Sequence, residues 1–215
     1  MNNMERPTAL CINLDSQPEK YNHVLKEFED ILDIKRVSAI DAIKENISGK
    51  DALYRTTTNI INSLFTDNNY SYPYLIIIED DIYKYKNFKL YWPKILDFIN
   101  TTQTGWDFIS LDFFLNLENA PLEIYNDFLY KADKSRNKGF MIYNSEFIKR
   151  EKEYLTECGC ADMMMCRNTN FVKLIPKELI VKQFTNKVSA TCGLITSHYE
   201  AFYNETEQYL KEYPF

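Results

Sequence analysis

Residues 75–82, with the sequence LIIIEDDI, place four consecutive aliphatic side chains directly before three acidic ones. An uninterrupted aliphatic run of this length is typical of a strand that is buried on both faces, in the middle of an α/β sheet. Burial of three ionised carboxylates would be very costly, so the chain must leave the core at Glu79. Ligands of open α/β sheets bind at the carboxyl ends of the strands, and we therefore expect Glu79, Asp80 and Asp81 at a ligand-binding edge.

The spacing of these acids indicates a metal site. Glu79 and Asp81 are two residues apart, so both can reach one divalent cation if the backbone turns there. Mg²⁺ and Mn²⁺ prefer such oxygen ligands and leave coordination positions open for phosphate oxygens. The motif therefore favours a substrate that carries a diphosphate. The alternative is an acidic strand end that only solubilises a turn, and the motif alone does not separate the two.

Composition excludes several classes of protein. The chain has 215 residues, 45% of them hydrophobic and 26% charged, which predicts a soluble globular protein of one domain, or of one domain with a small appendage. Its net charge is 25 minus 31, or −6, and it has no long basic segment, so no affinity for nucleic acid is expected. Its apolar runs are too short for a transmembrane segment.

The number and spacing of the Cys residues predict the redox compartment of the protein. An odd number of Cys, five, without a CxxC pair or an apolar leader predicts reduced thiols and a cytoplasmic location, the host cytoplasm if the protein is viral. Cys158, Cys160 and Cys166 suggest zinc as an alternative, but a fourth ligand at a sensible spacing is missing.

Apolar periodicity predicts alternating strands and helices. The first strand, helix and second strand form one βαβ unit with parallel strands. Ser16 is expected to cap the first helix, and Ser145 a later one. Residues 116–138 show no clear periodicity. The predicted strands are 8–15, 35–40, 75–78, 106–112, 139–143, 171–175 and 179–183, and the predicted helices are 18–32, 51–66, 87–100, 145–155 and one that begins at Ser197. The predicted fold class is α/β, with a mixed, mainly parallel central sheet flanked by helices.

The order of these motifs resembles that of glycosyltransferase family 25, which includes collagen galactosyltransferases and lipopolysaccharide glycosyltransferases, and that of small glycosyltransferases of large DNA viruses. Only the acidic motif with its strand is specific by itself. The matching pieces span most of the chain and are residues 12–15 (INLD), 18–20 (PEK), 37–41 (VSAID) and 77–81 (IIEDD), the Tyr143 segment, Asp162, Pro176 and Gln183.

The resemblance implies a GT-A fold with a Rossmann-like nucleotide-binding half. Residues 1–215 would form a single domain, in which residues 1–112 bind the nucleotide sugar and metal, and residues 113–215 bind the acceptor and end in a helix. The implied reaction moves a sugar from a nucleotide-diphosphate donor, most simply a UDP-sugar, to a hydroxyl of a glycan or glycoprotein acceptor, with inversion.

The resemblance also assigns site residues. Asp81 would ligate Mn²⁺ or Mg²⁺, Glu79 would ligate the metal or contact the ribose, and His198 would be a further ligand, with a capping or surface role as its alternative. Ser16 and Gln17 stand where the family usually has arginines, so a basic contact to the donor would be either absent or supplied by Arg55. The donor-binding residues implied in this way are Asn13, Leu14, Asp15, Asp41, Arg55, Glu79 and Asp80.

Inverting transfer needs a base that takes the proton of the acceptor hydroxyl. We assign this role to Asp162, which follows Gly159 at an expected helix start, although Asp162 could equally be only a helix N-cap. Asp112, at the end of a predicted strand, is the alternative base or an acceptor-binding group. Two other functions fit clustered acids, namely a metal-dependent phosphohydrolase and a catalytically silent nucleotide-sugar-binding protein.

Overall fold

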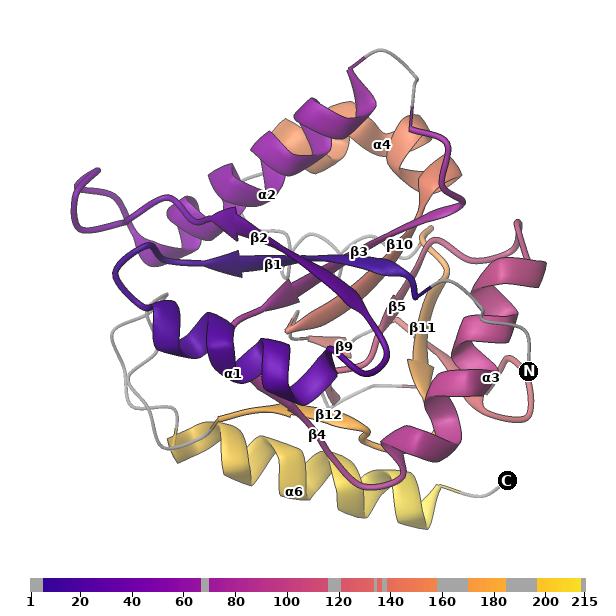
Figure 1. The fold of residues 1–215 in the computed structure, drawn as a ribbon. Helices are drawn as coiled ribbons and strands as arrows, with labels where there is room; N and C mark the ends of the chain where they lie inside the picture. Colours follow the sequence, from indigo (N-terminus) through magenta and orange to yellow (C-terminus); the bar gives the residue numbers. More distant parts are fainter. Residues whose placement is uncertain are drawn as a thin grey trace.

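An eight-stranded sheet with helices on both faces organises the protein (Figure 1). The computed structural model describes residues 6–66, 70–115, 121–133, 135–136, 139–157, 170–184 and 197–213. The strands of the sheet are β1 (Thr8–Asn13), β2 (Asp33–Ser38), β3 (Tyr74–Glu79), β5 (Phe108–Ser110), β7 (Leu122–Ile124), β8 (Leu129–Ala132), β10 (Phe140–Asn144) and β11 (Lys173–Pro176). Their spatial order is β2-β1-β3-β10-β5-β11-β8-β7.

The sheet is mixed and mainly parallel, which confirms the predicted fold class. β1 pairs in parallel with β2 and β3, and β11 pairs in parallel with β5. β10 runs antiparallel between β3 and β5, and β8 runs antiparallel between β11 and β7. In the described sheet, therefore, only β8 and β10 oppose the common direction. The carboxyl ends of β1, β2, β3 and β5 consequently meet at one edge, together with the amino end of β10.

Two pairs of helices cover the two faces of the sheet. α2 (Gly49–Phe65) and α4 (Ser145–Glu157) lie against one face, and α1 (Pro18–Phe28) and α3 (Phe88–Thr101) lie against the other (Figure 1). α6 (Ser197–Glu212) lies beyond α1, next to the two-stranded pair of β4 (Ile82–Lys84) and β12 (Val181–Gln183). A second small pair joins β6 (Phe114–Leu115) to β9 (Ser135–Arg136). Among the helices described, none has the length and apolar character needed to cross a membrane.

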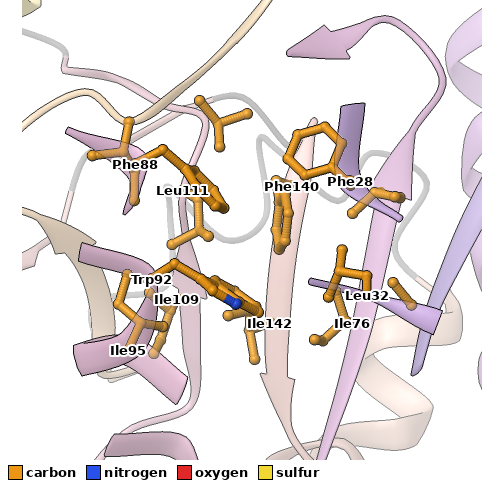
Figure 2. Close-up of a cluster of buried hydrophobic side chains, with 14 of the residues drawn as sticks. Phe28, Leu32, Ile76, Phe88, Trp92, Ile95, Ile109, Leu111, Phe140 and Ile142 are labelled. Atoms are coloured by element: carbon orange, nitrogen blue, oxygen red, sulfur yellow. The ribbon is translucent and has the colours of Figure 1, made fainter. Parts of the chain in front are cut away.

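The central strand is buried on both faces, as its sequence predicts. Ile76 and Ile78 are fully buried in the cluster beneath α1 and α3, whereas Leu75 and Ile77 belong to the cluster beneath α2 and α4. On the first side, Phe140 of β10 lies between aromatic rings of two helices (Figure 2), with centroids 5.8 Å from Phe28 and 5.9 Å from Trp92. Because side chains alternate along β3, both helical layers pack against the strand that carries the acids.

The helix predicted over 18–32 is shorter and is not capped by Ser16. Gln17 is the N-cap, without a side-chain cap hydrogen bond, because the amide of Gln17 first closes a turn onto the carbonyl of Leu14 at 2.9 Å. The helix ends at Phe28, whose carbonyl accepts from the amide of Leu32 at 2.9 Å. Leu32 packs into the core from this turn, and the apolar spacing therefore continues past the helix.

Other boundaries also differ from the prediction. The carboxamide oxygen of Asn144, rather than Ser145, accepts from the first turn of α4, at 2.9 Å from the amide of Glu146. Ser145 instead donates its hydroxyl hydrogen to the carbonyl of Tyr72. Pro93 lies inside α3 and does not mark its start. The strands β4, β6, β7, β8 and β9 were not expected, because runs of two to four residues are too short for periodicity to register.

Candidate functional site

The three acids form a turn at the carboxyl edge of the sheet. Glu79 ends β3, and Asp80 and Asp81 form the turn into β4. The amide of Glu79 donates to the carbonyl of Gly139 at 2.8 Å, and the carbonyl of Asp81 accepts from the amide of Phe184 at 2.9 Å. Ile78 is fully buried while all three acids are half-buried, so the chain leaves the core at Glu79 as predicted.

A pocket with apolar walls lies beside this acidic turn. Its walls come from the carboxyl end of β1, from the loop after β2 and from the first turns of α2. Glu79 and Asp80 supply its carboxylates. The remaining lining residues are Ile12, Leu14, Ala39, Ile40, Ala42, Gly49, Ala52 and Leu53. A ring with polar groups at one side suits such a pocket, because the apolar residues contact the ring and the acids accept from its N–H or O–H groups.

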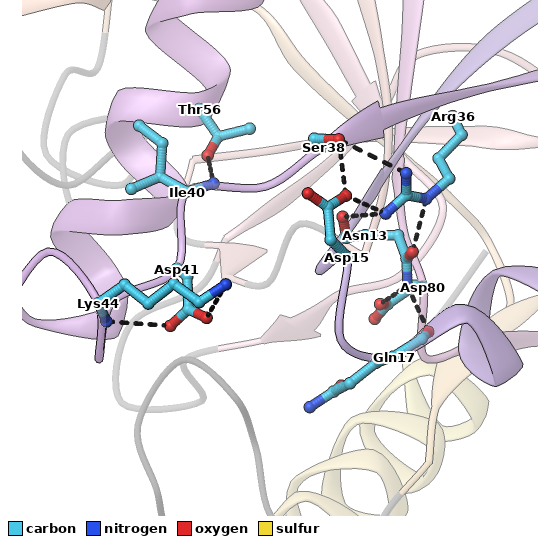
Figure 3. Close-up of polar contacts among 10 residues, drawn as sticks. All are labelled: Asn13, Asp15, Gln17, Arg36, Ser38, Ile40, Asp41, Lys44, Thr56 and Asp80. Atoms are coloured by element: carbon cyan, nitrogen blue, oxygen red, sulfur yellow. Dashed lines mark hydrogen bonds and ion pairs between the residues drawn. The ribbon is translucent and has the colours of Figure 1, made fainter.

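A polar network connects Asp80 to the neighbouring strands (Figure 3). Asn13 donates through Nδ2 to Asp80 Oδ2 at 2.7 Å, and its Oδ1 accepts from Arg36 Nε at 2.8 Å. Arg36 also donates from Nη2 to Asp15 Oδ1 at 2.5 Å, and Ser38 donates its hydroxyl hydrogen to the same oxygen at 2.7 Å. Because Arg36 occupies the oxygen of the Asn13 amide, that amide must turn its N–H groups toward Asp80.

The network also sets the charge of two carboxyl groups. Burial raises the pKa of Asp80, and the hydrogen bond from Asn13 and the charge of Lys20 lower it in part. The hydrogen bond from Arg36, followed by that from Ser38, lowers the pKa of Asp15. The edge therefore holds an ionised Asp15 beside Arg36 and a carboxylate at Asp80 that Asn13 helps to keep ionised.

Asp81 lies on the other side of the turn, toward β12. Burial, followed by the charge of Asp80, raises the pKa of Asp81 to about 6. Its Oδ1 is enclosed and has no hydrogen-bond partner among the described residues. The side chain of Gln183 hydrogen-bonds to Asp81, which lowers the pKa of that acid in part, and donates through Nε2 to Glu79 Oε2 at 3.1 Å. One amide thus reaches both carboxylates, so Glu79 and Asp81 adjoin the same space.

These two acids fit a hard divalent cation. A buried carboxylate oxygen without a partner is costly unless a cation or a donor meets it. In the described ranges, no three His, Cys, Asp or Glu side chains are grouped so that they could hold a metal ion. Mg²⁺ is commonly held by one or two carboxylates together with substrate phosphates, and Glu79 and Asp81 match that smaller donor set. The side chain of His198 and the whole of Asp162 lie outside the described residues, as do Cys158, Cys160 and Cys166.

The structure brings some of the expected residues to the pocket and leaves others away from it. Leu14 lines the pocket, and Asn13 and Asp15 lie in the network beside it. Asp41 does not line it, since its Oδ1 accepts from the amide of Ile43 at 3.0 Å within its own loop. Arg55 is exposed on α2 and is not a lining residue. Asp112 is fully buried and accepts from the hydroxyl of Tyr203 at 2.5 Å.

Sequence reasoning missed Arg36 and Ser38. They are two residues apart in β2, so strand alternation places both on one face, which is a detectable signal. The βαβ unit predicted their parallel partner strand but not the register, which sets Arg36 opposite Cys11 and Ser38 opposite Asn13 and is a tertiary feature. Thr56 was missed as well, and its hydroxyl accepts from the amide of Ile40 at 2.9 Å.

Arg36→Met tests the energetic weight of this network. We expect a loss of about 1 kcal/mol in the free energy of unfolding, because the variant removes the part-buried hydrogen bond to the Asn13 amide, whereas the ion pair with the exposed Asp15 adds little. Urea denaturation monitored by circular dichroism measures it. Lys35→Met is the matched control on the same strand, since the ion pair of Lys35 with Asp33 spans 3.7 Å between side chains that are 63% and 53% exposed. A pair of this kind is worth well under about 1 kcal/mol, and equal losses in the two variants would contradict the prediction.

Comparison with known proteins shows no family for this chain. No family model matches the chain, and no curated protein matches it. Among solved structures, A197 from STIV is 12% identical with a TM-score of 0.40, and the alignment covers 79% of this chain and 81% of that one. A putative glucose-1-phosphate thymidylyltransferase from Bacillus anthracis, in complex with a sucrose, is 11% identical with a TM-score of 0.42 over 98% and 96% of the two chains. Neither likeness assigns a fold or an activity to this chain, and its mixed α/β sheet is described from its own strand pairing.

Proposed function

We propose that this protein is a metal-dependent glycosyltransferase that moves a sugar from a nucleotide-diphosphate donor, such as a UDP-sugar, to a hydroxyl of a glycan or glycoprotein acceptor. The main support is one arrangement at the sheet edge. Glu79 and Asp80 line the pocket with apolar walls, while Glu79 and Asp81 adjoin a common space beside it. A nucleotide diphosphate needs this pairing, with a pocket for its ring and carboxylates that hold a cation against its phosphates. The motif order shared with family 25 supports the same reading.

The chain's own residues then bind and orient the donor. Leu14, Ile40 and Leu53 would enclose the faces of the nucleobase. Asp80, held by Asn13, would accept a hydrogen bond from the nucleoside. Asp81 and Glu79 would hold Mn²⁺ or Mg²⁺, which when bound offsets the negative charge of the departing diphosphate.

The acceptor step requires a base. As the acceptor oxygen bonds to the anomeric carbon, the bond from that carbon to the diphosphate oxygen breaks, and the hydroxyl proton passes to a carboxylate. We assign that carboxylate to Asp162 and propose inversion at the anomeric carbon, on the strength of the family resemblance. Asp112 is less suited to the role, because it is fully buried.

Asp162→Asn separates binding from transfer. We expect affinity for UDP in the presence of Mn²⁺ to stay within about twofold and transfer to fall by about 100-fold or more, because a general base contributes a factor of this size. Calorimetry measures the binding, and release of UDP from a UDP-sugar with acceptor measures the transfer. Equal loss of both would show that Asp162 has a structural role.

The function itself is tested by titrating wild-type protein with Mn²⁺ and a panel of UDP- and GDP-sugars in a calorimeter. Release of the nucleoside diphosphate is then assayed with glycan and glycoprotein acceptors. Binding with acceptor-dependent release is the expected result. Binding without release in any acceptor mixture would favour a silent binding protein, and release of inorganic phosphate would favour a hydrolase.

A further inference from the structure

A buried polar chain connects the C-terminal helix to the acidic turn. The hydroxyl of Tyr203 on α6 donates to Asp112 Oδ1 at 2.5 Å and accepts from the backbone amide of Gln183 at 2.8 Å. The side chain of Gln183 continues the chain by donating to Glu79 Oε2 at 3.1 Å. Asp112 and Tyr203 are 0% exposed and Gln183 is 5% exposed, so water does not compete for the two hydrogen bonds of the Tyr203 hydroxyl.

The backbone of Gly139, directly before β10, closes this series of hydrogen bonds into a ring. Gly139 accepts from the amide of Glu79 at 2.8 Å. A Cβ atom at position 139 would lie 2.3 Å from Asp112 Oδ2, so the carboxylate of Asp112 packs directly against that glycine. Glu79 is therefore linked to Asp112 in two ways, through Gln183 and Tyr203 on one side and through Gly139 on the other.

The ammonium group of Lys182 also restricts the ring of Tyr203. Lys182 Nζ lies 4.9 Å from the centroid of the Tyr203 ring and 3.9 Å from that of Tyr85. Glu207 of the same helix forms an ion pair with Lys86 at 2.8 Å. Contacts of this kind restrict where the Tyr203 hydroxyl can lie, and hence where Gln183 can present its amide.

We infer that Tyr203 and Asp112 are positioning residues, which act through Gln183 to hold Glu79 in the geometry required for metal and diphosphate binding. The inference rests on the proposed function and deepens it by giving α6 a role at the site. Asp112, fully buried against Gly139, acts through its hydrogen bond to Tyr203 and not on the acceptor. Gln183 couples Tyr203 to the acids, because its backbone amide donates to the Tyr203 hydroxyl while its side chain hydrogen-bonds to Glu79 and Asp81.

Tyr203→Phe tests the inference, with Tyr130→Phe as its matched control. Both variants remove one hydroxyl from a fully buried tyrosine, but the hydroxyl of Tyr130 has no hydrogen-bond partner among the described residues. We expect Tyr203→Phe to weaken the affinity for UDP with Mn²⁺ about 10-fold, the lower end of the about 10- to 100-fold cost of losing a hydrogen-bond partner of a metal ligand, because Tyr203 acts on Glu79 through Gln183. Tyr130→Phe should change that affinity by less than about twofold, as expected of a substitution without a shared contact. Calorimetry is run at a temperature at which circular dichroism shows each variant folded.

A readout without ligand separates positioning from general stability. In ¹⁵N–¹H spectra of the free protein, the side-chain amide of Gln183 and the backbone amide of Glu79 should shift in Tyr203→Phe and not in Tyr130→Phe. Gln183→Met removes the hydrogen bond from Gln183 to Glu79 and leaves the Tyr203–Asp112 pair in place. This variant therefore tests the inference if Tyr203→Phe does not fold. It should lose affinity to a similar degree, and the double variant should lose no more than either single one, because the residues act in series.

The outcomes distinguish this inference from the proposed function. If wild type binds UDP with Mn²⁺ and Tyr203→Phe matches Tyr130→Phe in affinity and spectra, the positioning role is wrong and the proposed function stands. If wild type does not bind the nucleotide, the proposed function is wrong, and the amide shifts alone decide whether Tyr203 positions Glu79. Additive losses in the double variant would show that Tyr203 and Gln183 act independently.

Discussion

Asp81→Asn should abolish the binding of UDP that depends on Mn²⁺ while leaving the fold intact. The substitution removes a charge whose Oδ1 has no partner in the described structure, so no protein hydrogen bond to that atom is lost. The loss of affinity should exceed the about 10- to 100-fold typical for partners of metal ligands, because a ligand itself is changed. Calorimetry with and without Mn²⁺ measures it. Unchanged affinity in Mn²⁺ would show that Asp81 is not a ligand.

The same variant should make the metal-free protein more stable at neutral pH. The pKa of Asp81 in the folded protein is about 6, above the value of about 3.9 expected when the chain is unfolded. The folded state therefore binds more protons between these values, and the free energy of unfolding falls as pH rises from about 4 to 6. At pH 7 the carboxylate costs about 1–3 kcal/mol, which Asp81→Asn should recover.

Urea denaturation at several pH values with chelator present checks this sign. The free energy of unfolding of the wild type should fall as pH rises from about 4 to 6, and that of Asp81→Asn should fall less. Asp97→Asn is a suitable control, because Asp97 is exposed on α3. The same pH slope in all three proteins would mean that Asp81 is not the group that titrates.

Gly139→Ala should be among the most destabilising single changes at the sheet edge. The added methyl group would lie 2.3 Å from Asp112 Oδ2 and 2.6 Å from Ile82 Cγ2. Neither neighbour can yield easily, since Asp112 is held by Tyr203 and Ile82 is fully buried. We expect a loss of about 1–3 kcal/mol or more, the usual cost of overpacking a core, measured by urea denaturation.

The displaced strand should also affect the site, because Gly139 accepts from the amide of Glu79. Weakened binding of UDP with Mn²⁺ is therefore expected at temperatures where the variant remains folded. A denaturation midpoint equal to that of wild type would show that the edge of the sheet tolerates a side chain at this position.

Much of the architecture could be predicted from local patterns. The aliphatic run before Glu79 is long enough to require burial on both faces, and β3 lies between β1 and β10 with helices over each face. Helices α2, α3, α4 and α6 lie close to their predicted ranges, since each has an apolar side that repeats every three to four residues. Strands β7, β8 and β9 escaped prediction because a few residues carry too little periodicity.

The sequence by itself determined where the acids lie along the chain and that they must face a sheet edge, because an aliphatic strand cannot bury three charges. Only the tertiary structure decided which residues meet them. Arg36 reaches Asn13 through the pairing of β1 with β2, and Gln183 and Tyr203 approach Glu79 from more than a hundred residues away in the chain. The tertiary structure also decided that Asp112 is buried and hydrogen-bonded to Tyr203, because Gly139, directly before β10, and α6 pack against this carboxylate. Periodicity fixes the face on which a side chain lies, whereas contacts between distant elements depend on how those faces pack.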